Sequence, residues 1–318
     1  MAEARMHGVD DGLAGRASTA LAVIDSVILG KSAQTRLCLA CLLARGHLLI
    51  EDIPGVGKTI LAQTLARALG LSYQRIQFTS DLLPADIIGV SVFERDKAEF
   101  RFHPGPIFAQ VILADEVNRA TPKAQSALLE AMEEHQVTAD GTTRKLPEPF
   151  FVIATQNPAH QIGTFPLPES QLDRFLMRVE LGYPDEAAER DLLEGRDRRE
   201  MLDEVQPVLT PDDLQAMQQA VGGVHVSDAL LDYAQALVRF SRQCPEFEAG
   251  LSPRAALAMV RAARAWALLS GHPAVQPEDL QAVLPGVVSH RLRPTDNTGG
   301  PQTPTEISRH LLESVPIP

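Results

Sequence analysis

The chain has 318 residues, 45% of them hydrophobic and 22% charged, which is enough apolar material for two domains of ordinary size. Its 29 basic and 41 acidic residues give a formal net charge of −12, which argues against a nucleic-acid-binding protein unless basic residues gather locally. The longest apolar run, residues 37–44, is far shorter than the roughly 20 residues that span a bilayer, and residues 1–18 lack the apolar segment of a signal peptide. We therefore expect a cytoplasmic protein without a membrane span.

The N-terminal part divides into two stretches. Residues 1–16 carry no clear pattern and are expected to be flexible. From residue 17 to residue 45 apolar side chains recur at helical spacing, with an interruption near Gly30. Cys38 and Cys41 lie inside this helical pattern without a second cysteine pair, so we expect buried thiols there rather than a metal or redox site.

The pattern of apolar residues changes in the middle of the chain. Short apolar runs alternate with helical patterns, which is typical of a doubly wound parallel sheet. The runs are residues 47–50, 72–78, 111–114, 150–155 and 177–181. Ligands on such sheets bind beyond the carboxyl ends of the strands, and polar segments follow the first, third and fourth runs. This pattern predicts an α/β domain over residues 17–184.

Start and stop signals define the connecting elements. A helix is predicted over residues 59–69, ending at Gly70, and another over residues 121–135, opened by Thr121-Pro122. Asp140-Gly141 indicates a hairpin within residues 138–146, and residues 90–102 read as a second hairpin.

After residue 184 the strand-like runs stop. Residues 185–293 are predicted to form a smaller all-α domain with helices at 186–203, 210–220, 227–243, 252–269 and 277–288. Residues 294–318 read as a tail that begins as a flexible linker and includes a candidate short helix near its end.

The segment EDIPGVGKT, residues 51–59, has the pattern of a phosphate-binding loop between a strand and a helix. Glycines at 55 and 57 allow the backbone N–H groups to turn toward a phosphate, and a helix N-terminus follows. Lys58 supplies a positive charge to the β- and γ-phosphates of ATP, and the Thr59 hydroxyl is a candidate Mg²⁺ ligand. The predicted nucleotide-binding residues are Pro54, Gly55, Val56, Gly57, Lys58, Thr59 and Ile60.

Asp52 occupies the position where such loops usually carry their first glycine. We expect its side chain to turn back and accept hydrogen bonds from local backbone N–H groups, as aspartates do in turns. The alternative is that its charge weakens or abolishes nucleotide binding.

Two further strand ends carry polar groups. Asp115 follows a buried run and is a candidate Mg²⁺ ligand through water, and Glu116 is the candidate general base for an attacking water. The alternative without a catalytic role is an acidic pair at the start of a helix. Thr155 or Asn157 follows the next run, where an amide would orient water, although Asn157 also fits an ordinary turn.

Phosphoryl transfer also gains from a guanidinium opposite the developing charge. Arg174 and Arg254 are the best candidates, with Arg119 and Arg178 in reserve. Taken alone, Arg174 and Arg254 also fit ordinary surface or helix-start residues.

Five motifs, taken together and in their order, resemble the MoxR family of AAA+ ATPases over about residues 20–293. They are GVGKT, VILADEVNRA, FFVIATQNP, TFPLPESQLDRF and LSPRA. The resemblance implies a five-stranded P-loop domain, a helical lid, and ATP with Mg²⁺ held between subunits of a homo-oligomeric, commonly hexameric, ring. It also implies roles for the residues above: Lys58 and Thr59 as Walker A, Asp115 and Glu116 as Walker B, Asn157 as sensor 1, Arg174 as an arginine finger acting in trans, and Arg254 as sensor 2. Asp52 becomes a mark of this branch of the family, residues 81–106 resemble its helix-2 insert, and residues 137–146 resemble its hairpin before sensor 1.

The same resemblance implies a chaperone that matures or activates partner protein complexes, sometimes with metal or cofactor insertion. Its usual partner carries a von Willebrand factor A domain, which this chain does not contain and which must therefore be a separate protein. Two other classes stay open: a nucleic-acid motor or chelatase-like ATPase subunit, and a nucleotide-gated scaffold without hydrolysis. The acidic charge argues against the motor, and the presence of both Asp115 and Glu116 argues against the scaffold.

Overall fold

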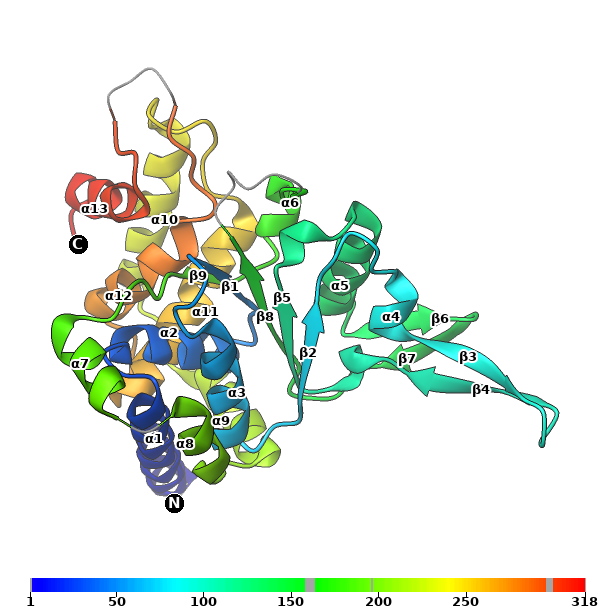
Figure 1. Cartoon of the computed structure of the whole chain (residues 1–318). Helices are drawn as coiled ribbons and strands as arrows, with labels where there is room; N and C mark the ends of the chain where they lie inside the picture. The colour runs from blue at the N-terminus through cyan, green and yellow to red at the C-terminus, as the bar shows by residue number, and fades with distance from the viewer. Residues whose placement is uncertain (1, 158–163, 196, 296–299, 318) are drawn as a thin grey trace.

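The computed structural model describes residues 2–157, 164–195, 197–295 and 300–317. It comprises an α/β part built on a central parallel sheet and a helical lid that packs beside it (Figure 1). Residues 158–163, within and after the FFVIATQNP motif, lie outside the described residues.

The central sheet has five strands in the order β2-β5-β8-β1-β9. Their bounds are β1 Leu48–Glu51, β2 Tyr73–Gln77, β5 Val111–Asp115, β8 Phe151–Gln156 and β9 Met177–Val179. All neighbouring pairs are parallel, with Gln77 opposite Asp115 and Glu51 opposite Gln156. The five predicted runs are therefore confirmed as strands, and their carboxyl ends meet at one edge, which we call the carboxyl edge.

Helices cover both faces of this sheet, and the three inner strands, β5, β8 and β1, alternate apolar side chains between the two cores. On one face Leu48, Ile50 and Leu113 share a core with α1 Ala2–Val27, α2 Ser32–Leu43, α3 Lys58–Ala68 and the lid. On the other face Leu49 and Ile112 pack with α4 Pro84–Ile88 and α5 Pro122–Glu134. The lid thus shares the core of the α2–α3 face.

Two hairpins extend from the face that α5 covers, as Figure 1 shows. The first pairs β3 Gly89–Glu94 with β4 Glu99–Pro104, and the second pairs β6 Gln136–Ala139 with β7 Thr142–Lys145. In the second hairpin Asp140 and Gly141 have φ of 53° and 73°, the left-handed values that a two-residue turn needs. The strand pairing confirms both predicted hairpins. Short 3₁₀ turns at Pro106–Phe108 and Val117–Arg119 and the helix α6 Glu169–Leu172 complete this part.

The helices that follow β9 are α7 Glu186–Glu194, α8 Arg198–Glu204, α9 Pro211–Gly223, α10 Asp228–Gln243, α11 Pro253–Ser270, α12 Pro277–Val288 and α13 Pro304–Ser314. Side-chain caps start several of them: Ser227 accepts from Leu230 N–H, and Ser252 accepts from Ala255 N–H. Helix α11 packs on α2, α9 and α12, so the lid is tied to the α/β part along α2.

Three details differ from the expectations. The helix α1 begins at Ala2 instead of about residue 17, and Leu13, the first member of a buried stripe with Ala17, Ala20 and Ile24, lies in the stretch expected to be flexible. The helix expected over residues 186–203 is two helices, and α8 turns to pack on α3. The short helix expected near the end of the tail is present as α13, but it packs with the lid, because it buries Ile307 and Leu311 against α10 and α12.

Among the described residues, no helix is both long and apolar enough to cross a bilayer. Cys38 and Cys41 are fully buried in α2, as expected. Burial raises the pKa of the Cys38 thiol to about 12 and that of Cys41 well above its ordinary value, so both are held as neutral thiols.

Candidate functional site

The loop between β1 and α3 has the backbone of an anion cradle. Gly55 and Gly57 have φ of 89° and 91°, conformations that side-chain-bearing residues rarely adopt, and Gly57 directly precedes the first residue of α3. Apart from the glycine itself and its two chain neighbours, no heavy atom of the described residues lies within 4 Å of the point where a Cβ would stand on Gly55 or Gly57. The loop is therefore open on the side where a phosphate would approach the helix N-terminus.

Lys58 is the first residue of α3, and its ammonium group contacts two other residues. Its Nζ donates to the backbone oxygen of Asp52 at 2.6 Å and lies 3.5 Å from Asn157 Oδ1. Partial burial lowers the pKa of the Lys58 ammonium, against the opposing effect of Asp52, Asp115, Glu116 and Glu51. Because burial disfavours the charged form of Lys58, an anion bound in the open loop beside it would stabilise that charge.

The Asp52 side chain does not face the open loop. Its Oδ1 accepts from Ile53 N–H at 2.8 Å, which is the local turn contact that we expected. Its Oδ2 accepts from Leu181 N–H at 2.6 Å and from Gly182 N–H at 2.7 Å, beyond the end of β9. The carboxylate therefore joins the loop to the segment that leads into the lid, and its three N–H donors hold its charge away from the cradle.

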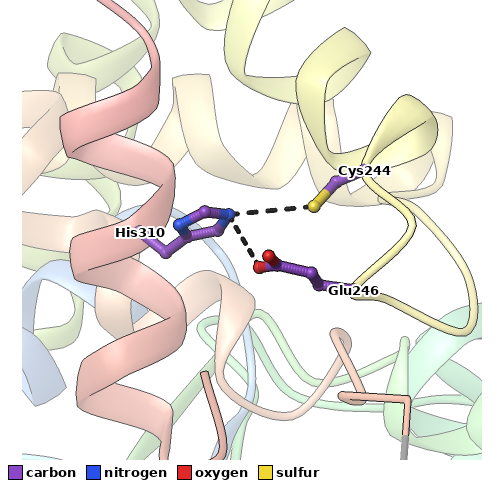
Figure 2. Close-up of side chains that lie close together, drawn as sticks. All are labelled: Cys244, Glu246 and His310. Atoms are coloured by element: carbon purple, nitrogen blue, oxygen red, sulfur yellow. Dashed lines mark hydrogen bonds and ion pairs between the residues drawn. The ribbon is translucent and has the colours of Figure 1, made fainter. Parts of the chain in front are cut away.

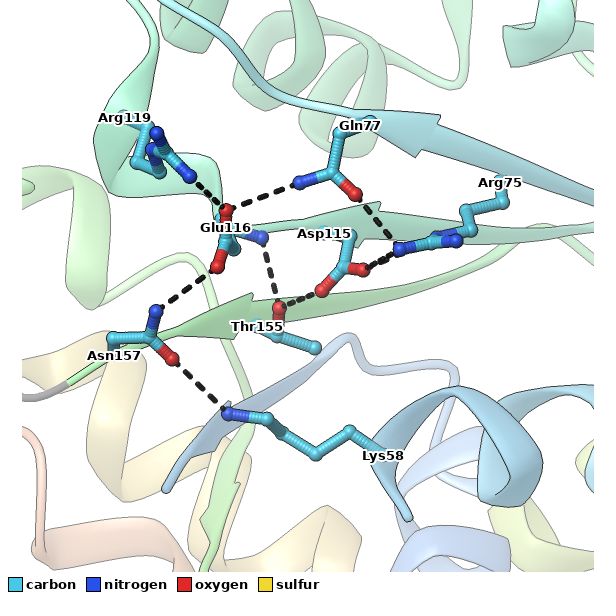
Figure 3. A network of polar contacts seen from close by, with 8 residues as sticks. All are labelled: Lys58, Arg75, Gln77, Asp115, Glu116, Arg119, Thr155 and Asn157. Atoms are coloured by element: carbon cyan, nitrogen blue, oxygen red, sulfur yellow. Dashed lines mark hydrogen bonds and ion pairs between the residues drawn. The ribbon is translucent and has the colours of Figure 1, made fainter. Parts of the chain in front are cut away.

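Glu116 stands directly after β5 in the left-handed conformation, with φ of 56°, which is a strained position for a residue with a side chain. Its Oε1 accepts from Asn157 Nδ2 at 3.0 Å, and its Oε2 accepts from Gln77 Nε2 at 3.1 Å and Arg119 Nη1 at 2.7 Å. Asn157 thus touches Lys58 on one side and Glu116 on the other (Figure 3). The amide lies between the two groups that the sequence assigned to ATP.

Asp115 belongs to a closed ring of contacts in the same view (Figure 3). Thr155 Oγ1 donates to Asp115 Oδ1 at 2.6 Å and accepts from Glu116 N–H at 2.8 Å. Arg75 donates to Asp115 Oδ2 through Nε at 3.1 Å and Nη2 at 2.5 Å, and Nη2 also reaches Gln77 Oε1 at 2.7 Å. Gln77 returns to Glu116, so the ring fixes both carboxylates from three neighbouring strands.

These residues fit a magnesium nucleotide. The open glycine loop and Lys58 suit the phosphates, and carboxylate and hydroxyl oxygens are what Mg²⁺ prefers, with Asp115 and Thr59 as the available donors. Bound there, the metal would neutralise phosphate charge. Arg75, about half exposed, supplies the positive charge beside the buried Asp115 carboxylate.

Arg174 and Arg254 lie together in a different place. Both pair with the carboxylate of Glu133, at the end of α5: Arg174 Nη1 reaches Oε2 at 2.9 Å, and Arg254 Nη2 contacts Oε1. Arg174 Nη1 also donates to Leu129 O at 2.7 Å. One glutamate therefore clamps an arginine of the α/β part to an arginine of the lid.

This pair lies at the opposite edge of the sheet from the phosphate loop. Leu176 N–H, next to the start of β9, donates to His47 O, just before β1, so this region faces the amino ends of the strands. Both arginines line a cavity of about 230 Å³ whose other members include Arg45, Gly46 and His47, which precede β1. The strands separate this amino edge from the carboxyl edge, where the chain's own Lys58 and Glu116 lie.

The reserve arginines occupy other positions. Arg119 pairs with Glu116, as described, and so belongs to the carboxyl edge. Arg178 lies on β9 and pairs with Glu51 at 2.9 Å and with Glu180. Arg178 is thereby engaged within its own sheet.

Several residues of both clusters escaped sequence reasoning. Gln77 ends β2, so the rule that polar groups gather at carboxyl ends could have found it. Arg75 lies two residues earlier on β2, and Glu133 lies on α5 among other acidic residues, so neither carried a local signal. The contacts of Asp52 with Leu181 and Gly182 depend on the pairing of β1 with β9, which no local pattern shows.

Comparisons with known proteins agree with this geometry. A family model described as "ATPase family associated with various cellular activities (AAA)" matches residues 47–177, and an AAA lid domain model matches residues 239–310. The chain is 44% identical over 297 residues to an uncharacterized protein, YeaC, of Bacillus subtilis, covering 93% of this chain and 92% of that protein. It is 38% identical over 325 residues to Chaperone MoxR1 of Mycobacterium tuberculosis, covering 98% and 85%. A solved structure of a candidate ATPase from Cytophaga hutchinsonii matches with a TM-score of 0.89 at 33% identity, covering 99% of this chain and 98% of that one.

Fold and site together define a nucleotide-binding AAA+ domain with its helical lid. Within that class, the chain belongs to the MoxR family of AAA+ ATPases.

Proposed function

We propose that the chain is an ATP-hydrolysing MoxR-type chaperone that remodels, matures or activates partner protein complexes. The observation that carries the hydrolytic part is the position of Glu116, which Asn157 links to Lys58 at the mouth of the glycine loop. In this role residues 54–60 bind ATP, Thr59 and Asp115 hold Mg²⁺, and Glu116 takes the proton of the attacking water. Asn157 orients that water through its amide.

A second subunit completes the site. Arg174 and Arg254 lie at the amino edge, so they can stabilise the developing charge on ATP only at the carboxyl edge of a neighbouring copy. Contacts that run from one edge to the other are head-to-tail, and such contacts close into a ring when the rotation permits. We propose a homo-hexamer.

The partners are proteins. The β3–β4 hairpin carries Phe93 and Phe100, 49% and 73% exposed with ring centroids 5.2 Å apart, and it projects from the body of the domain (Figure 1). Exposed aromatic side chains suit transient contact with a client complex. A separate protein with a von Willebrand factor A domain is the expected adaptor, metal or cofactor insertion is one form that the maturation can take, and the cytoplasm is the proposed location.

Glu116→Gln tests the hydrolytic assignment. The amide keeps the size of the side chain but cannot accept a proton, so steady-state ATP turnover should fall by on the order of 10²–10⁴-fold while ATP affinity is retained. Arg95→Gln, on the exposed turn of the β3–β4 hairpin, is the control that changes one charge away from the site. Unchanged turnover in Glu116→Gln would remove Glu116 as the base.

The same preparation separates the alternative functions. Pull-down with Glu116→Gln in ATP should enrich a protein client. ATP turnover stimulated by DNA, with DNA binding that weakens steeply with salt, would instead indicate a motor. An assembled wild-type ring without turnover would indicate a nucleotide-gated scaffold.

A further inference from the structure

A cluster of three potential metal ligands lies in the lid, far along the chain from the nucleotide site. Cys244 directly follows α10, Glu246 comes two residues later, and His310 lies on α13. Their ligand atoms, one thiol sulfur, one carboxylate oxygen and one imidazole nitrogen, all lie within 4.8 Å of one another. Figure 2 shows the three side chains converging from two separate segments.

Two distances inside the cluster are close to those of a coordination shell. His310 Nε2 lies 3.8 Å from Cys244 Sγ and 3.0 Å from Glu246 Oε2. Zinc bonds of about 2.3 Å to sulfur and about 2.1 Å to nitrogen or oxygen, at tetrahedral angles, separate sulfur from nitrogen by about 3.6 Å and nitrogen from oxygen by about 3.4 Å. These two distances differ from the tetrahedral values by about 0.2 Å and about 0.4 Å, and all three ligand atoms already lie within 4.8 Å of one another.

The carboxylate oxygen in this cluster lacks a donor. Glu246 Oε2 is buried and accepts no aligned hydrogen bond from the described residues, although His310 Nε2 is near. A buried carboxylate oxygen without a donor is costly, and a cation between it and the imidazole nitrogen would remove that cost. This observation is independent of the spacing of the three residues.

The surrounding structure holds the three groups in place. The segment that carries Glu246 is fixed to the chain before α13, because Thr295 N–H donates to Glu246 O at 2.9 Å and Glu248 N–H donates to Arg293 O at 3.0 Å. The ring of His310 packs between Phe240 and Phe247, with centroid distances of 5.4 and 6.2 Å. Metal sites need such preorganised ligands, so the cluster is more than a chance meeting of mobile side chains.

Accessibility separates Cys244 from the other two cysteines. Cys38 and Cys41 are fully buried in α2, whereas Cys244 is only partly buried, as are Glu246 and His310. The cluster borders solvent at Glu246 and His310, so a metal ion can enter there and displace the proton of the Cys244 thiol, whereas the core of α2 is closed.

We propose that Cys244 Sγ, Glu246 Oε2 and His310 Nε2 bind one Zn²⁺ ion, with water in the fourth position. Sulfur, nitrogen and oxygen donors in a tetrahedron favour zinc over magnesium or calcium, which take oxygen shells. The ion would join α13 to the end of α10 and so fasten the last helix of the lid. This site is independent of the proposed ATPase chemistry.

The test is a zinc titration of the full chain, stripped with a chelator and kept in excess Mg²⁺ without nucleotide, in competition with a chromophoric chelator. We expect one tight Zn²⁺ per wild-type chain. Cys244→Ser and His310→Gln should each weaken binding by about 100-fold or more, beyond the roughly 10–100-fold that loss of an outer partner costs. His225→Gln, an exposed histidine of the same lid, is the matched control and should bind like the wild type.

Cobalt substitution identifies the sulfur ligand. Co²⁺ added to the stripped wild-type chain should give a thiolate-to-cobalt absorption band that Cys244→Ser lacks and His225→Gln keeps. Because Asp115 and Thr59 contain no sulfur, binding at the nucleotide site cannot produce this band. Zinc should also raise the melting temperature of the wild type but not of Cys244→Ser.

The proposal is overturned if the wild type binds no stoichiometric zinc, or if both ligand variants bind zinc as tightly as the control. Circular dichroism of each variant verifies that it is folded. If Cys244→Ser or His310→Gln does not fold, Glu246→Gln replaces it in the same titration and is held to the same result.

Discussion

The two edges of the central sheet arrange charge in opposite ways. At the carboxyl edge the carboxylates of Asp115 and Glu116 are each surrounded by donors from several strands, beside a lysine and an open glycine loop. At the amino edge two arginines converge on the single carboxylate of Glu133. At the first edge Arg75 and Arg119 are paired with the chain's own Asp115 and Glu116, whereas the second edge holds two arginines without a phosphate loop. Each edge therefore has the composition of half a site.

The largest effect is expected when the two halves are inactivated on separate chains. Arg174→Ala and Lys58→Ala should each reduce ATP turnover, Arg174→Ala by on the order of 10³–10⁵-fold because an arginine finger carries that much of the rate. Mixing the two variants should restore part of the activity, since the wild-type carboxyl edge of one chain can meet the wild-type amino edge of the other.

Steady-state turnover of mixtures at several ratios measures this complementation, with each variant mixed with itself as the control. If no ratio exceeds the sum of the separate variants, the edges do not form a shared site, and the arginines act in another way.

The amino edge also depends on a neutral histidine. His47 is buried; its Nε2 lies 3.1 Å from Met132 O, and its Nδ1 accepts from Val152 N–H at 3.1 Å. Burial lowers the pKa of His47 to about 4. Its unfolded pKa is near 6.5, so between these values the unfolded chain binds the extra proton, and stability falls as pH falls. The loss should reach about 3 kcal/mol near pH 4.

Denaturant unfolding between about pH 7 and about pH 4 measures this slope. His47→Gln should flatten it, while His225→Gln should keep it. A residual slope is expected in His47→Gln, because burial and Arg291 also lower the pKa of His290 well below its ordinary value. An unchanged slope in His47→Gln would show that His47 does not govern the acid sensitivity of this edge.

Glu133→Gln removes the carboxylate that Arg174 and Arg254 share. Misplacing groups that stabilise a transition state costs up to about 100-fold, so turnover should fall within that range while the ATP affinity of the single subunit stays the same. Glu130→Gln removes a charge from the same helix and is the control. A rise in turnover would mean that Glu133 restrains the arginines instead of positioning them.

The smallest expected effect concerns Asp52 at the carboxyl edge. Asp52→Asn loses the charge and replaces one of the two accepting oxygens by an NH₂ group that cannot accept from backbone N–H, so unfolding free energy should fall by about 1–2 kcal/mol. Its carboxylate faces away from the cradle, so Asp52→Gly should not improve ATP affinity. A large gain in ATP affinity in Asp52→Gly, measured by titration, would mean that the charge of Asp52 does repel phosphate.

Sequence reasoning predicted the elements that local patterns define. The five strands, both hairpins and most helix starts depend on apolar periodicity and turn residues, which are written in neighbouring positions. The glycine loop and the Asp115-Glu116 pair were found for the same reason. The start of α1 was missed because its first buried contacts are made with distant helices, and three glycines in residues 1–16 obscured the pattern.

The parts that could not be predicted depend on which strands and helices become neighbours. Glu133 has no local feature that distinguishes it from Glu130 or Glu134, and its role follows only from the meeting of α5 with the start of α11. Cys244 and His310 are likewise 66 positions apart and meet because α13 packs on α10.

The left-handed backbone of Glu116 has a consequence for anyone who evolves this protein for robustness. A glycine at this position would relieve backbone strain of about 1–2 kcal/mol, which offsets part of what is lost with the contacts of the carboxylate to Asn157, Gln77 and Arg119. A screen that rewards only heat resistance would therefore penalise Glu116→Gly less than other losses of a paired carboxylate, although the variant has lost the proposed base. Retaining glutamate at this position needs selection for activity alongside selection for stability.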